Sequence, residues 1–403
     1  MVMKITGMRN LFKFPGWCLD RVELDPVETH VWLVRDGRAK LHCPHCGMIM
    51  SKNREVDRTA RDLPFGISTF VTIHYRAIQG RCRACNSYST IHPEHITNQE
   101  EATWRFRKFV SRLARHMPLN RIGELLGMHG TTAMHYDRSV LDEEVPEPNL
   151  DGIRVLLVDE KAVHRGHAYV TVVINGETGE PLYMAEGKKA ASLNGFFAQM
   201  TDKQKASIKA VGIDRSGSYQ KAIEENLPNA EIVYDKFHLV ANLNAVIDEI
   251  RRDAWRKATA EDKAFIKGQR YNLFRAWERS TDDQRDSLQA LLDLNADLNV
   301  AYVMKEAFSQ LWTYVYAKAA ENYLRKWVSW AEESAIAPLQ RFARGLWRAR
   351  KGIISFAKQS VTNGKIEALN NQIARLLHRS CGVRSLKYLF LQIRAQFLSA
   401  HPQ

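Results

Sequence analysis

Residues 153–235 carry the pattern that most constrains the fold of this chain. Three closely spaced stretches predict adjacent strands: IRVLLVD (153–159), HAYVTVVIN (167–175) and PLYMAE (181–186). Helix and strand patterns then alternate, in the order helix, strand, helix, strand and long helix (192–200, 208–214, 218–227, 231–235 and from about 237). Adjacent strands followed by such an alternation predict a mixed sheet covered by helices.

Two aspartates stand where strands of this sheet are expected to end. The order fits a ribonuclease-H-like fold, in which the C-termini of the first and fourth strands are neighbours, and these strands end at Asp159 and Asp214. A carboxylate at a buried strand end is costly unless it is paired or metal-bound. Because adjacent strand residues point to opposite faces, we expect Asp159 to be a ligand and Glu160 to support it or lie at the surface. Strand-end aspartates also form ordinary turns, so two alone are weak evidence.

A third carboxylate stands in SVTNGKIEALNNQIARLL (360–377). Residues 362–364 predict a helix start, and Glu367 lies at the edge of the apolar face of that helix. It is the single acid in the last seventy residues, among twelve Lys/Arg, so it either pairs with arginines or holds a metal. Asn370 and Asn371 flank it, and we expect Asn371 to support the site. Two or three carboxylates can hold two Mg²⁺ (or Mn²⁺) ions that clamp a phosphodiester.

Two cysteine pairs, in HCPHCG (42–47) and RCRAC (81–85), predict a structural zinc site. Each pair presents two thiolates from one tight turn, and two such turns close a tetrahedral Zn²⁺ site. The expected ligands are Cys43, Cys46, Cys82 and Cys85. Four thiolates leave no open coordination position, so a structural and not a catalytic role is expected. Reduced cysteines without metal are the alternative, and Cys18 and Cys381 are expected to be buried thiols.

A helix-turn-helix pattern follows at 109–141. Apolar residues at 119–126 are spaced for one helix face, Gly127 and Gly130 bracket a short turn, and Thr131 or Thr132 is a suitable cap for a second helix. The residues then expected to face DNA are Thr131, Thr132, His135, Tyr136 and Arg138. An ordinary helical hairpin is the alternative. The stretch DEEVPEPNLDG (142–152) is typical of a linker.

Charge and composition narrow the class of protein. The chain has 403 residues, of which 45% are hydrophobic and 26% charged, as in globular proteins of several domains. The net charge is +13, and residues 1–140 hold 21 Lys/Arg against 13 Asp/Glu. Two basic ends around a more acidic middle favour nucleic acid contacted at two places. The sequence has no run of eighteen apolar residues and no hydrophobic signal segment, so we expect no membrane contact and a cytoplasmic, nucleoid-associated location.

The expected fold class is multi-domain α/β plus α, in which a helical insertion interrupts the catalytic domain. The expected parts are a zinc-binding DNA-binding domain (1–98), a helix-turn-helix with linker (99–150), a ribonuclease-H-like domain (151–255 and 336–403) and an all-helical insertion (256–335). The insertion is rich in Trp and Tyr. We expect these aromatics to fill its own core, and stacking on bases near a cleavage site is the alternative.

Long motifs make the sequence resemble the ISL-three family of bacterial insertion-sequence transposases. The likeness covers nearly the whole chain and is carried by the CPxC…CxxC head, the helix-turn-helix, RDLP (61–64), VDEKAVHRGHAYVTVV (158–173), VGIDRSGSYQKAIEENLPNAEIVYDKFHLV (211–240) and TNGKIEALNNQIARLLHRSCGVRS (362–385). The resemblance implies a DDE catalytic domain whose triad is Asp159, Asp214 and Glu367. The DKFH element further implies that Asp235 and His238 support the site.

The function that this resemblance implies is that of a DNA transposase. Such a protein would bind the terminal inverted repeats of its insertion sequence, then cut DNA and join it to a target with Mg²⁺ (or Mn²⁺), and would carry structural Zn²⁺. Its partners would be double-stranded DNA and a second copy in a homodimer, because two ends must be recognised. A catalytically inactive DNA-binding regulator is one alternative, against which three intact carboxylates argue. A structure-specific nuclease of the same fold is another, against which the separate end-binding module argues.

Overall fold

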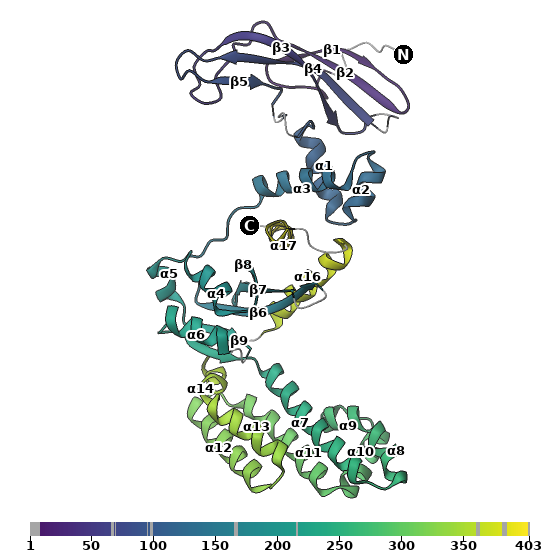
Figure 1. Ribbon diagram of the computed structural model, residues 1–403, viewed down its shortest axis with the longest axis vertical. Coiled ribbons are helices and arrows are strands. Elements are labelled where there is room, and N and C mark those ends of the chain that lie inside the picture. The colour runs from purple at the N-terminus through teal and green to yellow at the C-terminus, as the bar shows by residue number, and fades with distance from the viewer. Residues whose placement is uncertain are drawn as a thin grey trace. The chain divides into compact units, whose positions relative to one another are not determined.

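The chain packs into two compact units in the computed structural model, which describes residues 9–65, 68, 70–94, 96, 100–164, 168–214, 217–359, 363–380 and 385–401 (Figure 1). The first unit is Met1–Glu147 with His378–Cys381 and Leu391–Gln403, and the second is Pro148–Leu377 with Gly382–Phe390. Two short C-terminal segments therefore belong to the first unit, although the sequence assigned all of 336–403 to the catalytic domain. Within the described ranges, no helix has both the length and the apolar composition to cross a membrane.

The first unit opens with a five-stranded sheet. Its strands are β1 (Trp17–Glu23), β2 (Glu28–Arg35), β3 (Ser51–Asp62), β4 (Phe70–Arg81) and β5 (Tyr88–Ile91). The order is β1-β2-β4-β3, and β5 pairs with β4. The β2–β4 pair is parallel and the other pairs are antiparallel. Alternate residues such as Val31 and Ile73 point to one face and form the buried core of this sheet.

Three helices complete the first unit: α1 (Trp104–Ala114), α2 (Leu119–Leu125) and α3 (Gly130–Glu144). The turn between α2 and α3 is tight, because a Cβ atom at Gly123 would lie 2.5 Å from the carbonyl oxygen of Met128. The helix α3 begins at Gly130 after His129, so the prediction that Thr131 or Thr132 caps it is wrong. It also continues to Glu144, and the extended segment starts three residues later than expected.

The second unit contains a mixed sheet with the strand order β10-β9-β6-β7-β8. The strands are β6 (Val155–His164), β7 (Ala168–Asn175), β8 (Pro181–Glu186), β9 (Ala210–Ile213) and β10 (Glu231–Tyr234), and the helices between them are α4 (Ala190–Phe197), α5 (Asp202–Ser207) and α6 (Gly217–Asn226). The strand β6 is parallel to β9, β9 is parallel to β10, and β7 is antiparallel to both of its neighbours. These strands were predicted from the sequence, whereas α5 was not.

A long helical region follows the sheet and shares its core. Its helices are α7 (Lys236–Lys257), α8 (Ala260–Gly268), α9 (Arg270–Phe274), α10 (Asp282–Leu294), α11 (Ala296–Ser309), α12 (Ala317–Glu333), α13 (Ala337–Arg348), α14 (Arg350–Ile354) and α15 (Phe356–Gln359), with 3-10 turns η2 (Trp277–Arg279) and η3 (Gln310–Thr313). One apolar cluster runs from Ile153 in the sheet region to Ile353 in α14. Phe308 packs against Trp327 inside it, so these aromatics fill a core as expected, but it is a core that the helices share with the sheet. Two further helices, α16 (Gly364–Ser380) and α17 (Leu386–Ala400), end the chain.

Candidate active site and zinc centre

Asp159 lies in the middle of β6, where this strand loses one of its two partners. The prediction that the strand ends at Asp159 is wrong, because β6 continues to His164 and pairs with β7 along this length. The parallel pairing of β6 with β9 stops at Leu157, two residues before Asp159. Alternation places Asp159 on the sheet face of Leu157, opposite the face of Val158. The Asp159 carboxylate is therefore carried by a strand that is still paired with β7 but is no longer paired with β9.

Asp214 directly follows β9, as predicted. The register pairs Gly212 with Leu157, and its continuation by two residues aligns Asp214 with Asp159. Both carboxylates are thus positioned by adjacent parallel strands. Asp159 and Asp214 also interact electrostatically, since the negative charge of Asp214 helps to raise the pKa of Asp159.

A third aspartate and a histidine come from the start of α7 and meet Asp214. Asp235 caps α7 by accepting a hydrogen bond from the backbone N–H of Phe237, at 3.1 Å. The Nδ1 atom of His238 lies 2.7 Å from Asp235 Oδ2 and 2.6 Å from Asp214 Oδ1. In the described residues, the ligand atoms of Asp214, Asp235 and His238 form a group within 4.8 Å of one another, to which neither Asp159 nor Glu367 belongs.

The helix α16 reaches the same site through an asparagine. Asn370 donates a hydrogen bond of 2.6 Å from Nδ2 to Asp159 Oδ2, across 211 positions of sequence. Asn371, which the sequence favoured as the supporting residue, is exposed, and its role stays a prediction. Glu367 is exposed in the first turn of α16, one turn before Asn370 and about 60° around the helix axis. Its side chain is therefore carried on the part of α16 that approaches Asp159.

Two residues of this site, Asp159 and His238, have strongly shifted pKa values. Burial raises the pKa of Asp159 to about 6, and the nearby charge of Asp214 acts in the same direction. Hydrogen bonding to Asp214 and Asp235 raises the pKa of His238 to about 10, so the imidazole is protonated at neutral pH. A protonated imidazole between two carboxylates offsets their repulsion. The cluster is consequently a place where negative charge is concentrated and needs a cation.

The donor set fits a hard divalent cation such as Mg²⁺ or Mn²⁺. Nδ1 of His238 carries one hydrogen for two carboxylate oxygens, so Asp214 Oδ1 and Asp235 Oδ2 share a single donor. The Oδ1 atom of Asn370 is buried without a hydrogen-bond partner in the described structure. Uncompensated buried oxygens are rare, and oxygen atoms are the ligands that Mg²⁺ prefers. Asp159, Asp214 and Asn370 thus present oxygens that a cation can satisfy.

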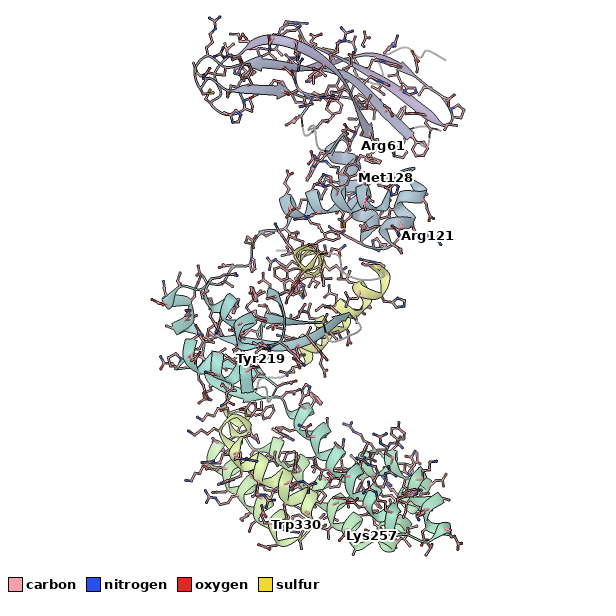
Figure 2. All side chains as sticks on the ribbon, in the orientation of Figure 1. Arg61, Arg121, Met128, Tyr219, Lys257 and Trp330 are labelled. Atoms are coloured by element: carbon pink, nitrogen blue, oxygen red, sulfur yellow. The ribbon has the colours of Figure 1, made fainter. Side chains whose placement is uncertain are left out.

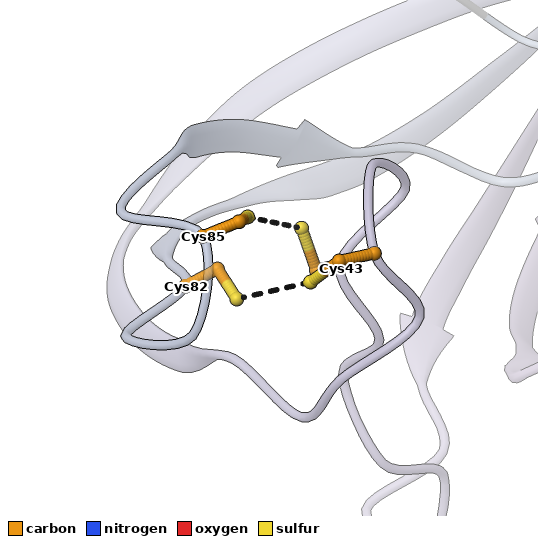
Figure 3. A group of neighbouring side chains, drawn as sticks. Cys43, Cys82 and Cys85 are labelled. Atoms are coloured by element: carbon orange, nitrogen blue, oxygen red, sulfur yellow. Dashed lines mark hydrogen bonds between the residues drawn. The ribbon is translucent and has the colours of Figure 1, made fainter.

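The four predicted cysteines converge at one end of the N-terminal sheet (Figure 3). Their sulfur atoms all lie within 4.8 Å of one another. The Cys43–Cys85 and Cys46–Cys82 sulfur distances are 3.6 and 3.5 Å. A tetrahedral ZnS₄ centre with Zn–S bonds of about 2.3 Å requires sulfur separations of roughly 3.8 Å, so the cluster can bind zinc with small adjustments.

Two equivalent turns shape the zinc centre. In the first, the backbone N–H of Cys43 bonds to Met48 O at 2.8 Å, and in the second, that of Cys82 bonds to Ser87 O at 2.9 Å. The residue after the last cysteine of each turn has a positive φ, which is 73° at Gly47 and 54° at Asn86. Glycine and asparagine are the residues that tolerate this conformation best. The local sequence therefore fixes both turns.

Hydrogen bonding favours the thiolate form of two of these cysteines, Cys43 and Cys85. For Cys46 the backbone N–H of Met48 acts in the same direction, but contacts with Cys82 and Cys85 outweigh it and raise the pKa to about 12. The Ser87 hydroxyl lies 3.4 Å from Cys43 Sγ and 3.0 Å from Cys85 Sγ, and it lowers the pKa of both, to about 6 for Cys43. Thiolates are the form that binds zinc. Cys18 lies outside the cluster and is exposed, so the prediction that it is buried is wrong. Cys381 lies outside the described residues.

The residues predicted to face DNA divide into two groups. Thr131 and His135 are exposed on α3, and Thr132 is half-buried. Arg138 is partly exposed and lies 3.4 Å from Asp142 in an ion pair. Tyr136 is only 4% exposed and packs edge-on against Phe106, so the prediction that it faces DNA is wrong. It sits on the core face of α3 because the helix starts at Gly130 and buries Ala133 and Tyr136 together.

The RDLP motif joins the sheet of the first unit to its helices (Figure 2). Arg61, at the end of β3, donates hydrogen bonds of 2.7 and 2.9 Å to the carbonyl oxygens of Leu126 and Gly127, which follow α2. Asp62 is buried and accepts a hydrogen bond of 2.6 Å from Thr103, the residue that caps α1. The sequence reasoning missed these roles, although the quoted motif and the unpaired carbonyls at a helix end were available signals.

Comparison with known proteins points to one family. The DDE-type ISL3 transposase family matches residues 156–393. The transposase for insertion sequence element IS1001 of Bordetella parapertussis is 30% identical over 396 residues, which are 97% of this chain and 97% of that protein. The transposase for insertion sequence element IS1557 of Mycobacterium tuberculosis is 27% identical over 256 residues, which are 58% of this chain and 57% of that protein.

The protein is thus a DNA-cleaving and DNA-joining enzyme of the DDE transposase class. More narrowly, the chain belongs to the ISL3 family of transposases, which confirms the resemblance seen in the sequence.

Proposed function

We propose that this protein cuts DNA at the terminal inverted repeats of its own insertion sequence and joins the freed 3′-hydroxyl ends to target DNA. The observation that carries the proposal is the alignment of Asp159 and Asp214 on adjacent parallel strands, at the edge where β9 ends and α16 approaches. A rigid pair of carboxylates beside an open edge suits a phosphodiester that must be held between metal ions.

The catalytic residues in this proposal are Asp159, Asp214 and Glu367, which would hold two Mg²⁺ (or Mn²⁺) ions. When bound, such ions stabilise the attacking and leaving oxygens of an in-line displacement at phosphorus. Asn370 orients Asp159 by its hydrogen bond, and His238 together with Asp235 orients Asp214 and offsets its charge.

We assign the sheet of the second unit to the ribonuclease-H-like class. The assignment is supported by the order β10-β9-β6-β7-β8, by the parallel β6, β9 and β10, and by the antiparallel β7. In such a sheet the functional residues lie at the carboxyl ends of the parallel central strands. The helical region inserted after α7 shares the core of the sheet, which supports a role in bracing the site.

End recognition is assigned to the first unit. The helices α2 and α3 and their tight turn support a helix-turn-helix, with Thr131, Thr132 and His135 as the side chains available to a major groove. Arg138 could take part only by giving up its ion pair with Asp142. Structural Zn²⁺ would fix the sheet beside these helices, and a homodimer would allow two ends to be bound together.

The test is cleavage of a plasmid that carries the flanking ends of the gene, in Mg²⁺ and then in EDTA. Nicks at the end boundaries that need Mg²⁺, and that disappear in Glu367→Gln while end binding is retained, are the expected result. Glu225→Gln is a matched control, because Glu225 is an exposed helical glutamate that lies 3.8 Å from Lys221 alone among the described cations. It should cut normally.

Three other outcomes would overturn parts of this proposal. Specific end binding without cutting by the wild-type protein would favour a DNA-binding regulator. Cutting that depends on branched DNA structure and not on the end sequence would favour a structure-specific nuclease. Full activity of Glu367→Gln would remove Glu367 from the catalytic set.

A further inference from the structure

The N-terminal sheet ends in an open hollow that the catalytic chemistry does not use. Its volume is about 450 Å³, and its lining residues come from three strands and one zinc-binding turn. They are Ser51, Lys52, Asn53, Arg81, Arg83, Asn86 and Tyr88. Those on the strands are neighbours across the sheet, because the strand register pairs Ser51 with Arg81, and Arg81 with Tyr88.

The lining has the chemistry of an anion site. Among the described residues that form it there are three cations and no carboxylate, and the other side chains offer hydroxyl or amide donors. Lys52 is paired with Glu55 at 2.5 Å, and Arg81 is held by Asn86 Oδ1 through Nε and Nη2 at 3.2 and 2.6 Å. These two cations are therefore partly satisfied before any ligand binds.

Arg83 differs from the other two cations. Its side chain is exposed, and it forms no ion pair with any residue that the structure describes. It stands between Cys82 and Cys85, so the turn that presents it is fixed by the backbone hydrogen bond of Cys82 and by the sulfur cluster. A free guanidinium on a rigid turn is well suited to bind a phosphate, because little freedom is lost on binding.

A β-bulge and an exposed tyrosine at the rim of the hollow support the binding of an extended polar ligand. The register of β3 shifts between Lys52 and Arg54, so Asn53 occupies a β-bulge, a device that redirects a side chain. Tyr88 is 67% exposed on the rim, with the Arg81 guanidinium 5.4 Å from its ring centre. Hydroxyl and amide groups of this kind commonly contact the sugar-phosphate backbone of DNA.

We propose that this hollow binds the phosphate backbone of double-stranded DNA at the ends of the insertion sequence, with Arg83 neutralising one phosphate. The inference rests on the proposed function, because it adds a backbone contact to the end-binding surface. The contact positions the duplex and does not read its bases, since no lining residue is placed on a recognition helix.

The test measures how binding of an end duplex depends on salt for the wild-type protein and for Arg83→Ala. Loss of one phosphate contact should reduce the slope of log K against log salt by about 0.9. The same relation gives roughly fivefold weaker binding near 0.15 M salt. The loss should be equal on end DNA and on scrambled duplex, because a phosphate carries no sequence information.

Matched variants separate a lost contact from a damaged domain. Arg83→Lys should recover most of the slope, because it restores the charge. Arg38→Ala removes an arginine that is 97% exposed and lies 3.8 Å from Asp36, and it should leave the slope unchanged. All variants should keep the zinc content of the wild type.

The outcomes distinguish this inference from the proposed function. If the wild-type protein does not prefer end DNA to scrambled duplex, the proposed function fails. If it does prefer end DNA, but Arg83→Ala keeps the wild-type slope, the hollow is not a phosphate site. A loss confined to one of the two duplexes would equally overturn the backbone contact.

Discussion

The cysteine cluster, which is the candidate zinc centre, and the carboxylate site are both candidate metal sites, but they are assembled in opposite ways. Each half of the zinc centre is made by one short turn, closed by a local hydrogen bond and by a residue with positive φ. The carboxylate site joins β6, the end of β9, the start of α7 and a helix more than two hundred positions later. The cysteine cluster therefore needs only two local turns to meet. The carboxylate site forms only when the second unit is folded.

This difference explains the chemistry of the two sites. Four thiolates complete a tetrahedron and leave no place for a substrate. The carboxylate site instead has a buried oxygen of Asn370 that receives no hydrogen bond in the described structure, and two aspartates that share one donor of His238. Oxygens of this kind are available to coordinate a cation. We therefore expect the cysteine cluster to serve stability and the carboxylate site to serve catalysis.

The largest expected effect comes from removing zinc. A structural zinc contributes on the order of 10 kcal/mol to folding, so a strong chelator should unfold the N-terminal sheet while the second unit keeps its structure. Hydrogen exchange, measured peptide by peptide with and without chelator, should show lost protection in β3, β4 and β5. Cys46→Ser should cause the same loss of protection. Cys18→Ser changes an exposed cysteine outside the cluster and should leave the protection unchanged. Unchanged protection after zinc loss would remove the contrast between the two sites.

The next effect separates two neighbouring asparagines on α16. Asn370→Ala should lower the rate of DNA cleavage by about 10–100-fold, because a group that orients a metal ligand typically has this influence. Asn371→Ala, at an exposed position on the same helix, should stay within about threefold of the wild type. Rates at several Mg²⁺ concentrations would show whether the lost activity reflects weaker metal binding. Equal losses in both variants would return Asn371 to the site.

A smaller effect tests whether the zinc-bound sheet holds its helices through Arg61. Arg61→Ala removes charged donors from two carbonyl groups after α2, and it should lower the free energy of unfolding of the first unit by about 2 kcal/mol. Arg121→Ala is the control, since Arg121 is 70% exposed and forms a surface pair with Glu124 that is worth less than about 1 kcal/mol. Denaturant unfolding of the zinc-loaded protein measures both. Equal stabilities would show that the sheet and helices are joined by other contacts.

The smallest effect concerns pH in the metal-free carboxylate site. Because the pKa of His238 is raised to about 10 in the folded protein, the proton stabilises the fold fully below the unfolded value of about 6.5. This stabilisation is lost as pH rises through about 10. The imidazole is half exposed, so solvent screening reduces the effect to about 1 kcal/mol or less. Denaturation between pH 6 and 10 should show the decline in the wild type and not in His238→Gln.

The sequence predicted much of the fold because the deciding signals are local. Alternating apolar residues gave the strands, the cysteine spacing gave the zinc cluster, and Asp214 was placed correctly after a strand. Prediction from the sequence failed where contacts with a neighbouring strand or helix decide the structure. β6 continues past Asp159 because β7 still pairs with it there, and no residue inside β6 signals this. Tyr136 was expected at the surface, but it is buried in the core of the three helices, where its ring packs against Phe106.

By itself, the sequence determined the candidate residues for the chemistry: four cysteines in two turns, two strand aspartates and one isolated glutamate among cations. Residue type and spacing suffice for this, because thiolates and carboxylates have intrinsic preferences for metals and turns have intrinsic backbone preferences. Only the tertiary structure decided that β9 ends beside Asp159, that Asn370 and not its neighbour contacts that carboxylate, and that His238 lies between two aspartates. Such contacts depend on strand register and on the rotation of a packed helix, which arise from burying whole faces against each other and not from any short stretch of sequence.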